Sequence, residues 1–296
     1  MAKFDDLIGK ELARGTWTWT ADEALLYAVG IGAGLEEPYA ELQFTTENTE
    51  NLPQQVIPSF LTLASTGRQL WMKPLGFKER VWGGISWGWP EGMVHGDEAV
   101  TLARSLPTSG TADVSLLLAG VYDKGSGALV IVDKKVVSTD TGEMLGTTRS
   151  GFFIRGQGGF GGPRSPAEEQ PWTKQERDPD ITVVHHTSPG QSLIYRLSGD
   201  RNPHCSDPAR ARADGFERPI FQGMGTYGFA CRALIKGLCD GDVRRFGSMF
   251  ARFSQPLYPG ETLETRIWRT ERGAQFQTIA SQTRLVLDRG IFTFAP

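Results

Sequence analysis

The chain has 296 residues, of which 39% are hydrophobic and 22% are charged, and its formal net charge is −3 at pH 7. This length suggests about two domains of roughly 100–200 residues each, and the composition is that of an ordinary globular protein. The small negative charge predicts no nucleic-acid partner and no attraction to an anionic membrane. Three cysteines are too few for a disulfide framework, which favours a reducing compartment.

The two ends of the chain and its apolar runs bear on localisation. The first residues, Met-Ala-Lys-Phe-Asp-Asp, lack the apolar segment of a secretory signal. The last residues, Phe-Ala-Pro, differ from the Ser-Lys-Leu peroxisomal address. Apolar runs such as 27–35 fall short of the roughly 20 residues that a membrane span needs. We therefore expect a cytoplasmic protein that does not enter the membrane.

The first half begins with a helix signal and continues with strand signals. Residues 20–23 (Thr-Ala-Asp-Glu) are typical of a helix start, and 25–30 follow as Leu-Leu-Tyr-Ala-Val-Gly. Beyond a turn near 103–111, runs rich in Val, Ile, Leu, Phe and Thr predict antiparallel strands. These runs are 113–121, 129–137 and 147–154.

Residues 71–89 hold four of the eight tryptophans in a stretch broken by Gly and Pro, which excludes a regular helix. Such an aromatic surface needs burial or a ligand. One hypothesis is core packing. The other is a lid over the pocket of a bulky, flat substrate, formed by Trp82 and Trp87.

A Gly/Pro-rich and then charged stretch, 156–180, predicts a linker between an N-terminal domain (1–155) and a C-terminal domain (181–296). Its glycines do not form a phosphate site. No Lys-Ser/Thr follows them as in a P-loop, and the dinucleotide fingerprint with its strand and helix is missing.

The second half repeats the order of elements of the first half. Residues 193–198 (Leu-Ile-Tyr-Arg-Leu-Ser) match 25–30, which places Tyr195 opposite Tyr27. Apolar residues at helical spacing predict a long helix over 222–238, although it contains several glycines, so we expect the surrounding sheet to approach it closely. Strand signals follow at 263–270, 275–281 and 284–287.

Residues 199–208 read Gly-Asp-Arg-Asn-Pro-His-Cys-Ser-Asp-Pro. Asn is a favoured N-cap and Pro suits the first helical position, so we predict a helix that opens at Pro203 with Asp200 and Asn202 beside its start. The matched position in the first half is Gly32. We therefore expect the chemistry in the second half, with the first half shaping the substrate pocket.

This segment resembles the signature of the MaoC-like hydratase 2 family, whose usual form is Gly-Asp-x-Asn-Pro-Leu-His. Residues 219–228 (Pro-Ile-Phe-Gln-Gly-Met-Gly-Thr-Tyr-Gly) are similar to the family's Pro-Ile-Leu-His-Gly-x-x-Thr-Tyr-Gly. Shorter matches extend the likeness over nearly the whole chain, at 27–33, 44–48, 94–96 and 155–160. The resemblance implies an α+β fold of two tandem hot-dog domains, each a helix wrapped by a curled antiparallel sheet.

The resemblance also implies a reaction. Such enzymes add water to a trans-2-enoyl-CoA to give the (R)-3-hydroxyacyl-CoA, or catalyse the reverse dehydration, with no metal or redox cofactor and as homodimers. A positioned base must take a proton from water, and the thioester oxygen needs preorganised donors. By family position, Asp200 is the catalytic acid/base, Asn202 orients water or substrate, and the Gly223 amide binds the thioester oxygen.

Two positions depart from the family pattern. The family's second acid/base is a histidine, but position 205 is Cys205, and His204 stands one step away, about 100° round a helix. Gln222 replaces another usual histidine. One hypothesis makes Cys205 a thiolate favoured by the start of the predicted helix, acting as an acid/base or nucleophile. The other makes it a small space-filling residue.

Further candidates are weaker. Tyr195 is placed near the site by the repeat, and His95 matches a family motif as a structural or pocket-lining residue. His185 and His186 are adjacent in a strand-like run and point to opposite faces, and no Cys/His cluster has zinc spacing, so we expect no metal.

The main hypothesis is a hydratase or dehydratase acting on an enoyl or 3-hydroxyacyl thioester of CoA or a carrier. One alternative is a repurposed enzyme that acts on a bulky polyketide-like or aromatic substrate through altered acid/base or cysteine chemistry. A second alternative is a non-catalytic acyl- or polyketide-binding protein.

Overall fold

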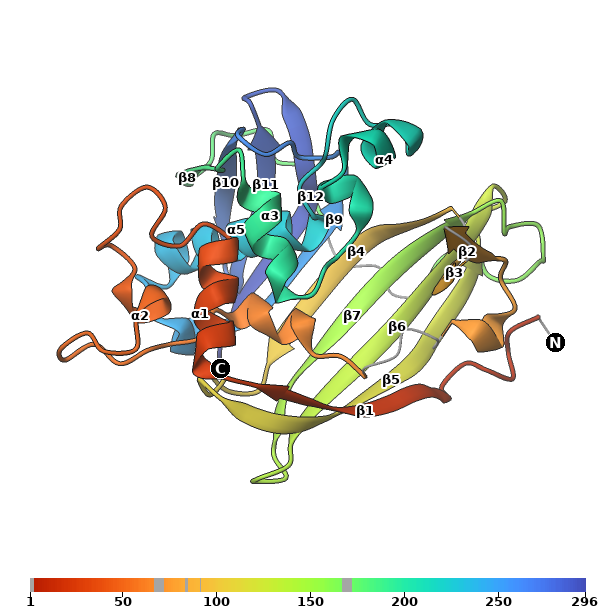
Figure 1. Ribbon diagram of the computed structural model, residues 1–296, viewed down its shortest axis with the longest axis horizontal. Coiled ribbons are helices and arrows are strands. Elements are labelled where there is room, and N and C mark those ends of the chain that lie inside the picture. The colour runs from red at the N-terminus through yellow and green to blue at the C-terminus, as the bar shows by residue number, and fades with distance from the viewer. Residues whose placement is uncertain (1–2, 67–71, 83–84, 91, 167–171) are drawn as a thin grey trace. The chain divides into compact units, whose positions relative to one another are not determined.

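The computed structural model (Figure 1) describes residues 3–66, 72–82, 85–90, 92–166 and 172–296, with only the main chain described at 79–82 and 85–89. The chain forms two compact units that draw on alternating parts of the sequence. Unit 1 comprises Met1–Thr18, Ala64–Ala99 and Thr111–Pro171, and unit 2 comprises Trp19–Leu63, Val100–Gly110 and Trp172–Pro296. The domain boundaries 1–155, 156–180 and 181–296 stay a prediction about the repeat along the sequence.

The main sheet of unit 1 has the strand order β1-β5-β6-β7-β4. Its strands are β1 (Glu11–Trp19), β4 (Met93–Leu102), β5 (Gly110–Asp123), β6 (Gly127–Ser138) and β7 (Met144–Arg155). The strands β5, β6 and β7 pair antiparallel and confirm the three strands predicted in the first half. Alternation is clear in β5, where the buried side chains of Val114, Leu116 and Leu118 turn one face of the strand toward the core.

A second, two-stranded sheet carries part of the tryptophan-rich stretch. Strands β2 (Glu79–Trp82) and β3 (Ile85–Pro90) pair antiparallel, with Val81 opposite Ser86. The side chains of Trp82 and Trp87 lie outside the described residues, so the lid hypothesis stays a prediction. Within the described part of unit 1, the helical structure is the short 3-10 helix η2 (Lys73–Leu75).

The glycine-rich segment after β7 wraps around a buried carboxylate of unit 1. Asp123, at the end of β5, accepts hydrogen bonds from the amides of Gly125 at 2.8 Å, Gly159 at 2.9 Å and Gly161 at 2.7 Å. The amide of Gly159, together with those of Gly125, Gly161 and Phe160, holds the pKa of Asp123 below its usual value. The start of the predicted linker is therefore fixed to β5.

Unit 2 contains an antiparallel sheet with the strand order β9-β12-β11-β10-β8. Its strands are β8 (Ile181–His186), β9 (Phe246–Phe253), β10 (Thr262–Thr270), β11 (Gly273–Ala280) and β12 (Arg284–Phe294). The predicted strands at 263–270, 275–281 and 284–287 are confirmed. The last strand is longer than predicted. Residues 288–290 (Asp-Arg-Gly) are typical of a turn, but here they form a β-bulge, where the register shifts between Asp288 and Ile291 and the strand continues.

Helix α5 (Gly223–Leu238) confirms the long predicted helix and packs against β8, β9, β10 and β12 (Figure 1). The sheet approaches this helix closely at Gly237, where a Cβ would lie 3.2 Å from side-chain atoms of Ile181 in β8 and of Ile267 in β10. The segment around α1 (Ala21–Gly30) makes a second close approach, at Gly228. A Cβ at Gly228 would lie 2.5 Å from Cγ2 of Ile31 and 3.0 Å from the hydroxyl of Tyr27. Any larger residue at Gly228 would push these elements apart.

The repeat predicted from sequence is visible inside unit 2. Helix α1 opens with a capping box in which Thr20 and Glu23 bond reciprocally, as its sequence predicted. The matched segment forms α3 (Gln191–Tyr195) and the 3-10 helix η3 (Arg196–Ser198), which lie beside α1 (Figure 1). The matched tyrosines, Tyr27 and Tyr195, are both fully buried, with ring centroids 6.1 Å apart.

The other helices of unit 2 are short: α2 (Leu42–Thr45), η1 (Pro58–Leu63), η4 (Pro203–Cys205), α4 (Pro208–Ala213) and η5 (Val243–Arg245). Throughout the described ranges, no helix is long and apolar enough to cross a membrane.

Replacing Asp123 by Asn should destabilise the protein near neutral pH, because an amide cannot accept all of these N–H bonds and carries no charge. The folded protein lowers the pKa of Asp123, so its contribution is present above the unfolded value of about 4 and is lost as the pH falls below it. Thermal unfolding of both proteins from about pH 7 to pH 3 should show a gap in Tm that narrows on acidification. Exposed Asp140→Asn is the control and should leave Tm unchanged. Equal Tm values for Asp123→Asn and the unaltered protein at neutral pH would contradict the prediction.

Candidate active site

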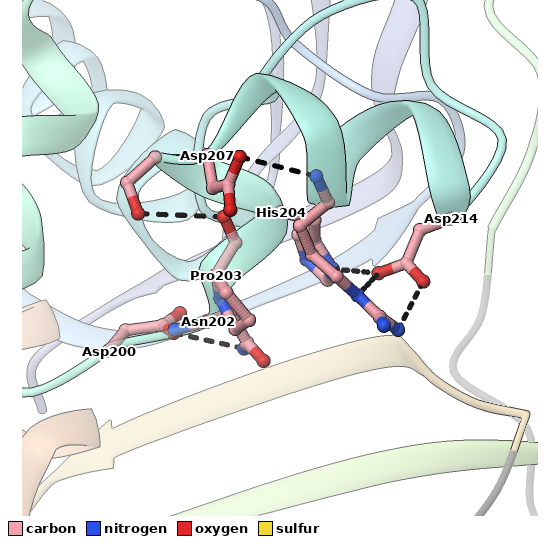
Figure 2. Close-up of polar contacts among 8 residues, drawn as sticks. Asp200, Asn202, Pro203, His204, Asp207 and Asp214 are labelled. Carbon is pink, nitrogen blue, oxygen red and sulfur yellow. Dashed lines mark hydrogen bonds and ion pairs between the residues drawn. The ribbon is translucent and has the colours of Figure 1, made fainter. Parts of the chain in front are cut away.

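The turn before η4 holds a carboxylate and an amide in direct contact. The main-chain N–H and the Nδ2 of Asn202 both donate to Oδ1 of Asp200, at 3.2 Å and 3.0 Å (Figure 2). Asp200 is half-buried and Asn202 is exposed. Among the described residues, no side chain or amide donates to the second oxygen of Asp200.

The helix predicted to open at Pro203 is a single 3-10 turn, η4, and the α-helix α4 begins only at Pro208. The prediction was wrong because Pro208 keeps Asp207 extended, at φ −106° and ψ 115°, and so interrupts a helix begun at 203. Asp207 caps α4 by accepting a hydrogen bond from the amide of Ala209 at 2.8 Å. Asn202 makes no cap bond, since its side chain binds Asp200.

Cys205 lies at the end of this turn and is only 2% exposed. Burial, and then the negative charge of Asp200, raise the pKa of the Cys205 thiol well above its usual value. The helix dipole invoked for a thiolate is missing, because η4 spans three residues. The structure therefore favours a neutral, space-filling thiol next to Asp200 over a thiolate.

His204 belongs to a different polar cluster. Its Nδ1 lies 3.0 Å from Oδ2 of Asp214, and Arg210 binds both oxygens of the same carboxylate. Figure 2 shows His204 turned toward Asp214, while Asp200 and Asn202 contact one another. His204 is thus engaged with Asp214, in agreement with the expectation that it does not replace the family histidine.

The residues at the start of α5 lie close to Asp200. Gly223 is its first residue, and the first amides of a helix have no partner inside that helix. Gln222, the residue before it, is 1% exposed and donates from Nε2 to the carbonyl of Asp200 at 3.5 Å. Tyr195 is fully buried and packs against Phe221, with ring centroids 5.6 Å apart. Tyr195 therefore packs against the residue that directly precedes Gln222.

The matched position in the first half has no room for an acid. Gly32 has φ +83°, and a Cβ there would lie 2.5 Å from the ring of Phe229 and 3.1 Å from Nη1 of Arg232. This geometry agrees with the expectation that the acidic group occurs only in the second half.

His95 lies in unit 1, in a polar cluster that the sequence did not reveal. Its Nε2 lies 3.0 Å from Oε2 of Glu98, which also accepts from Ser150 Oγ at 2.6 Å. The ring of His95 stacks on Phe152 at 4.8 Å. Residues three apart in a regular strand face opposite sides, so the spacing of His95 and Glu98 gave no signal.

The adjacent histidines of β8 point to opposite faces, as predicted. His185 is 5% exposed and His186 is exposed. Burial, with the nearby charges of Arg232 and Lys236, lowers the pKa of His185 to about 3, so its ring is neutral. Among the described residues, no group of three His, Cys, Asp or Glu side chains is arranged to hold a metal ion.

Comparison with known proteins identifies the class. The family model described as the MFE-2 hydratase 2 N-terminal domain matches residues 17–156, and the model described as a MaoC like domain matches residues 167–290. A conserved hypothetical protein of Mycobacterium tuberculosis with a double hot-dog fold covers 98% of this chain and 97% of its own, at 13% identity and a TM-score of 0.53. The chain has the fold of two tandem hot-dog domains.

Closer relatives give the family. The chain is 38% identical over 281 residues to 3-hydroxyacyl-thioester dehydratase Y of Mycobacterium tuberculosis, covering 92% of this chain and 91% of that protein. It is 36% identical to enoyl-CoA hydratase ChsH3 of the same organism, covering 90% of each. A solved MaoC-like dehydratase from Phytophthora capsici is 32% identical, with a TM-score of 0.80 and 98% of each chain covered. The chain belongs to the MaoC-like hydratase 2 family.

The cysteines of the folded protein should be unreactive. All three are buried, and burial raises the pKa of Cys231 to about 11 and that of Cys239 to about 12, in addition to its effect on Cys205. A thiol reagent at about pH 8 should therefore modify none of them in the native protein and all of them after unfolding. A fast-reacting native thiol that disappears in Cys205→Ser would contradict the neutral-thiol assignment.

Proposed function

We propose that the protein adds water to the double bond of a 2-enoyl thioester, or removes water from a 3-hydroxyacyl thioester, at the site formed by Asp200, Asn202 and Gly223. The observation that carries the proposal is the carboxylate of Asp200, held through one oxygen by Asn202 and tied through its main chain to the residue before α5. The names of the two bacterial relatives, a thioester dehydratase and an enoyl-CoA hydratase, support the reaction class.

Each residue has a role in the hydration direction. The second oxygen of Asp200 takes a proton from water as the water oxygen bonds to C3 of the enoyl group. The electron pair of the double bond moves toward the thioester carbonyl, whose oxygen is stabilised by the amide of Gly223 at the positive end of α5. Asp200 then returns its proton to C2, which completes the addition of water. Dehydration runs the same steps in reverse.

In this mechanism Asp200 carries out both proton transfers, from water and to C2. The neutral thiol of Cys205 contributes volume beside the carboxylate, and Asn202 fixes the carboxylate and orients the water. The proposal takes the substrate as a small molecule carried on CoA or on a carrier protein, as the name of the enoyl-CoA hydratase relative suggests. It takes the protein as a homodimer, in keeping with the family resemblance, and as cytoplasmic, because three cysteines without a disulfide framework favour a reducing compartment.

The test is a hydration assay that follows loss of the conjugated thioester absorbance with short, long and aromatic trans-2-enoyl-CoA substrates. Asp200→Asn should lower kcat by about 10²–10⁴-fold and leave Tm unchanged, because general acid–base catalysis supplies a factor of this size. The control is Asp207→Asn in the same segment, which removes a charge but keeps a good N-cap for α4, so both kcat and Tm should stay close to those of the unaltered protein.

Two outcomes would contradict the proposal. Unchanged turnover in Asp200→Asn would remove Asp200 from the chemistry. Absence of turnover by the unaltered protein on every enoyl-CoA, with tight binding of the same thioesters, would identify an acyl-binding protein instead.

A further inference from the structure

Gln222 joins three segments of unit 2 through one side chain. Its Nε2 donates to the carbonyl of Ser192 in α3 at 3.3 Å and to the carbonyl of Asp200 at 3.5 Å. Gln222 itself directly precedes Gly223, the first residue of α5. The main chain of the proposed base and the amide of the proposed oxyanion donor therefore share one anchor.

The amide oxygen of Gln222 has no hydrogen bond comparable to those of its Nε2 among the described residues. Oε1 of Gln222 is excluded from solvent and has no hydrogen-bond partner among the described residues. A buried acceptor without a donor destabilises a fold, so native structures rarely keep one without a reason. An apolar residue of the same size would avoid this loss but would also give up the two bonds from Nε2, so Gln222 contributes little net stability.

Gln191 gives the contrast within the same unit. It is also 1% exposed, and its Nε2 donates to the carbonyls of Val29 at 3.1 Å and Gly30 at 2.7 Å. Its Oε1 accepts from the amide of Ser188 at 3.3 Å. Both ends of Gln191 are satisfied, as expected for a glutamine that stabilises packing between α1 and α3.

We infer that Gln222 is a positioning residue that fixes Asp200 relative to the amide of Gly223. The inference rests on the proposed function. A shift of the base relative to the oxyanion donor misaligns groups that act together in the transition state, while the rest of the substrate still binds. Losing this anchor lowers kcat more than it changes KM.

The experiment compares Gln222→Met with Gln191→Met, since methionine approximates the length of glutamine and donates no hydrogen bond. Gln222→Met should lower kcat by about 10–100-fold, keep KM within about threefold and change Tm less than Gln191→Met does, because removal of the unpaired Oε1 offsets the loss of the two bonds from Nε2. Gln191→Met should lower Tm and leave kcat per folded molecule unchanged. The two variants thus exchange their effects on activity and stability.

A rescue variant supplies a second readout. Gln222→His restores a ring N–H at this position and should recover most of the kcat lost in Gln222→Met. If the methionine variant does not fold, Gln222→Asn takes its place, because its amide is one methylene further from Asp200. It should lower kcat in the same way.

The outcomes separate this inference from the proposed function. Turnover by the unaltered protein, with the same kcat in Gln222→Met, overturns the positioning role and leaves the proposed function standing. Parallel losses of Tm and kcat in Gln222→Met and Gln191→Met also overturn it, since both glutamines would then be structural. Absence of turnover by the unaltered protein overturns both proposals.

Discussion

The burial of helix α5 in unit 2 is the constraint on which the candidate site depends. Its central glycine, Gly228, admits Ile31 and Tyr27 at distances that no side chain would allow, and four strands of the sheet pack against the same helix. The first turn of a helix held so firmly is a fixed point in the molecule. Gly223 is the first residue of this helix and Gln222 precedes it, so the packing of α5 also fixes the Gly223 amide and the Gln222 side chain that binds the carbonyl of Asp200.

Electrostatics then decide what the site can do. The family resemblance implies two titrating groups, but Cys205 is buried beside Asp200, and both effects favour its neutral form. His204 is held by Asp214, and Gln222 does not titrate. Under the proposed function, Asp200 is the residue of this set that moves protons, and the hydratase 2 site works with a single carboxylate.

Much of the fold followed from local sequence signals. Runs rich in Val, Ile, Leu, Phe and Thr marked β5, β6, β7, β10 and β11, and apolar residues at helical spacing marked α5, because these residues form the buried faces of the elements. The matched tyrosines, Tyr27 and Tyr195, are in ring contact at the centre of unit 2.

The failures have physical causes that a single sequence hides. The helix expected at Pro203 ends after one turn because a second proline, five residues on, constrains its predecessor. Burial of the Cys205 thiol and the bond from Gln222 to Asp200 depend on segments brought together only by folding. The assignment of α1 to unit 2 has the same origin, since its partners α3 and α5 lie far along the chain.

The pH dependence of kcat/KM for hydration tests the central claim most directly, because it counts the titrating groups of the free enzyme. With one carboxylate and a neutral thiol, the unaltered protein should show a single rise with pH followed by a plateau to about pH 9, and Cys205→His should add a second ionisation. A bell-shaped profile in the unaltered protein, whose second limb disappears in Cys205→Ser, would contradict the account.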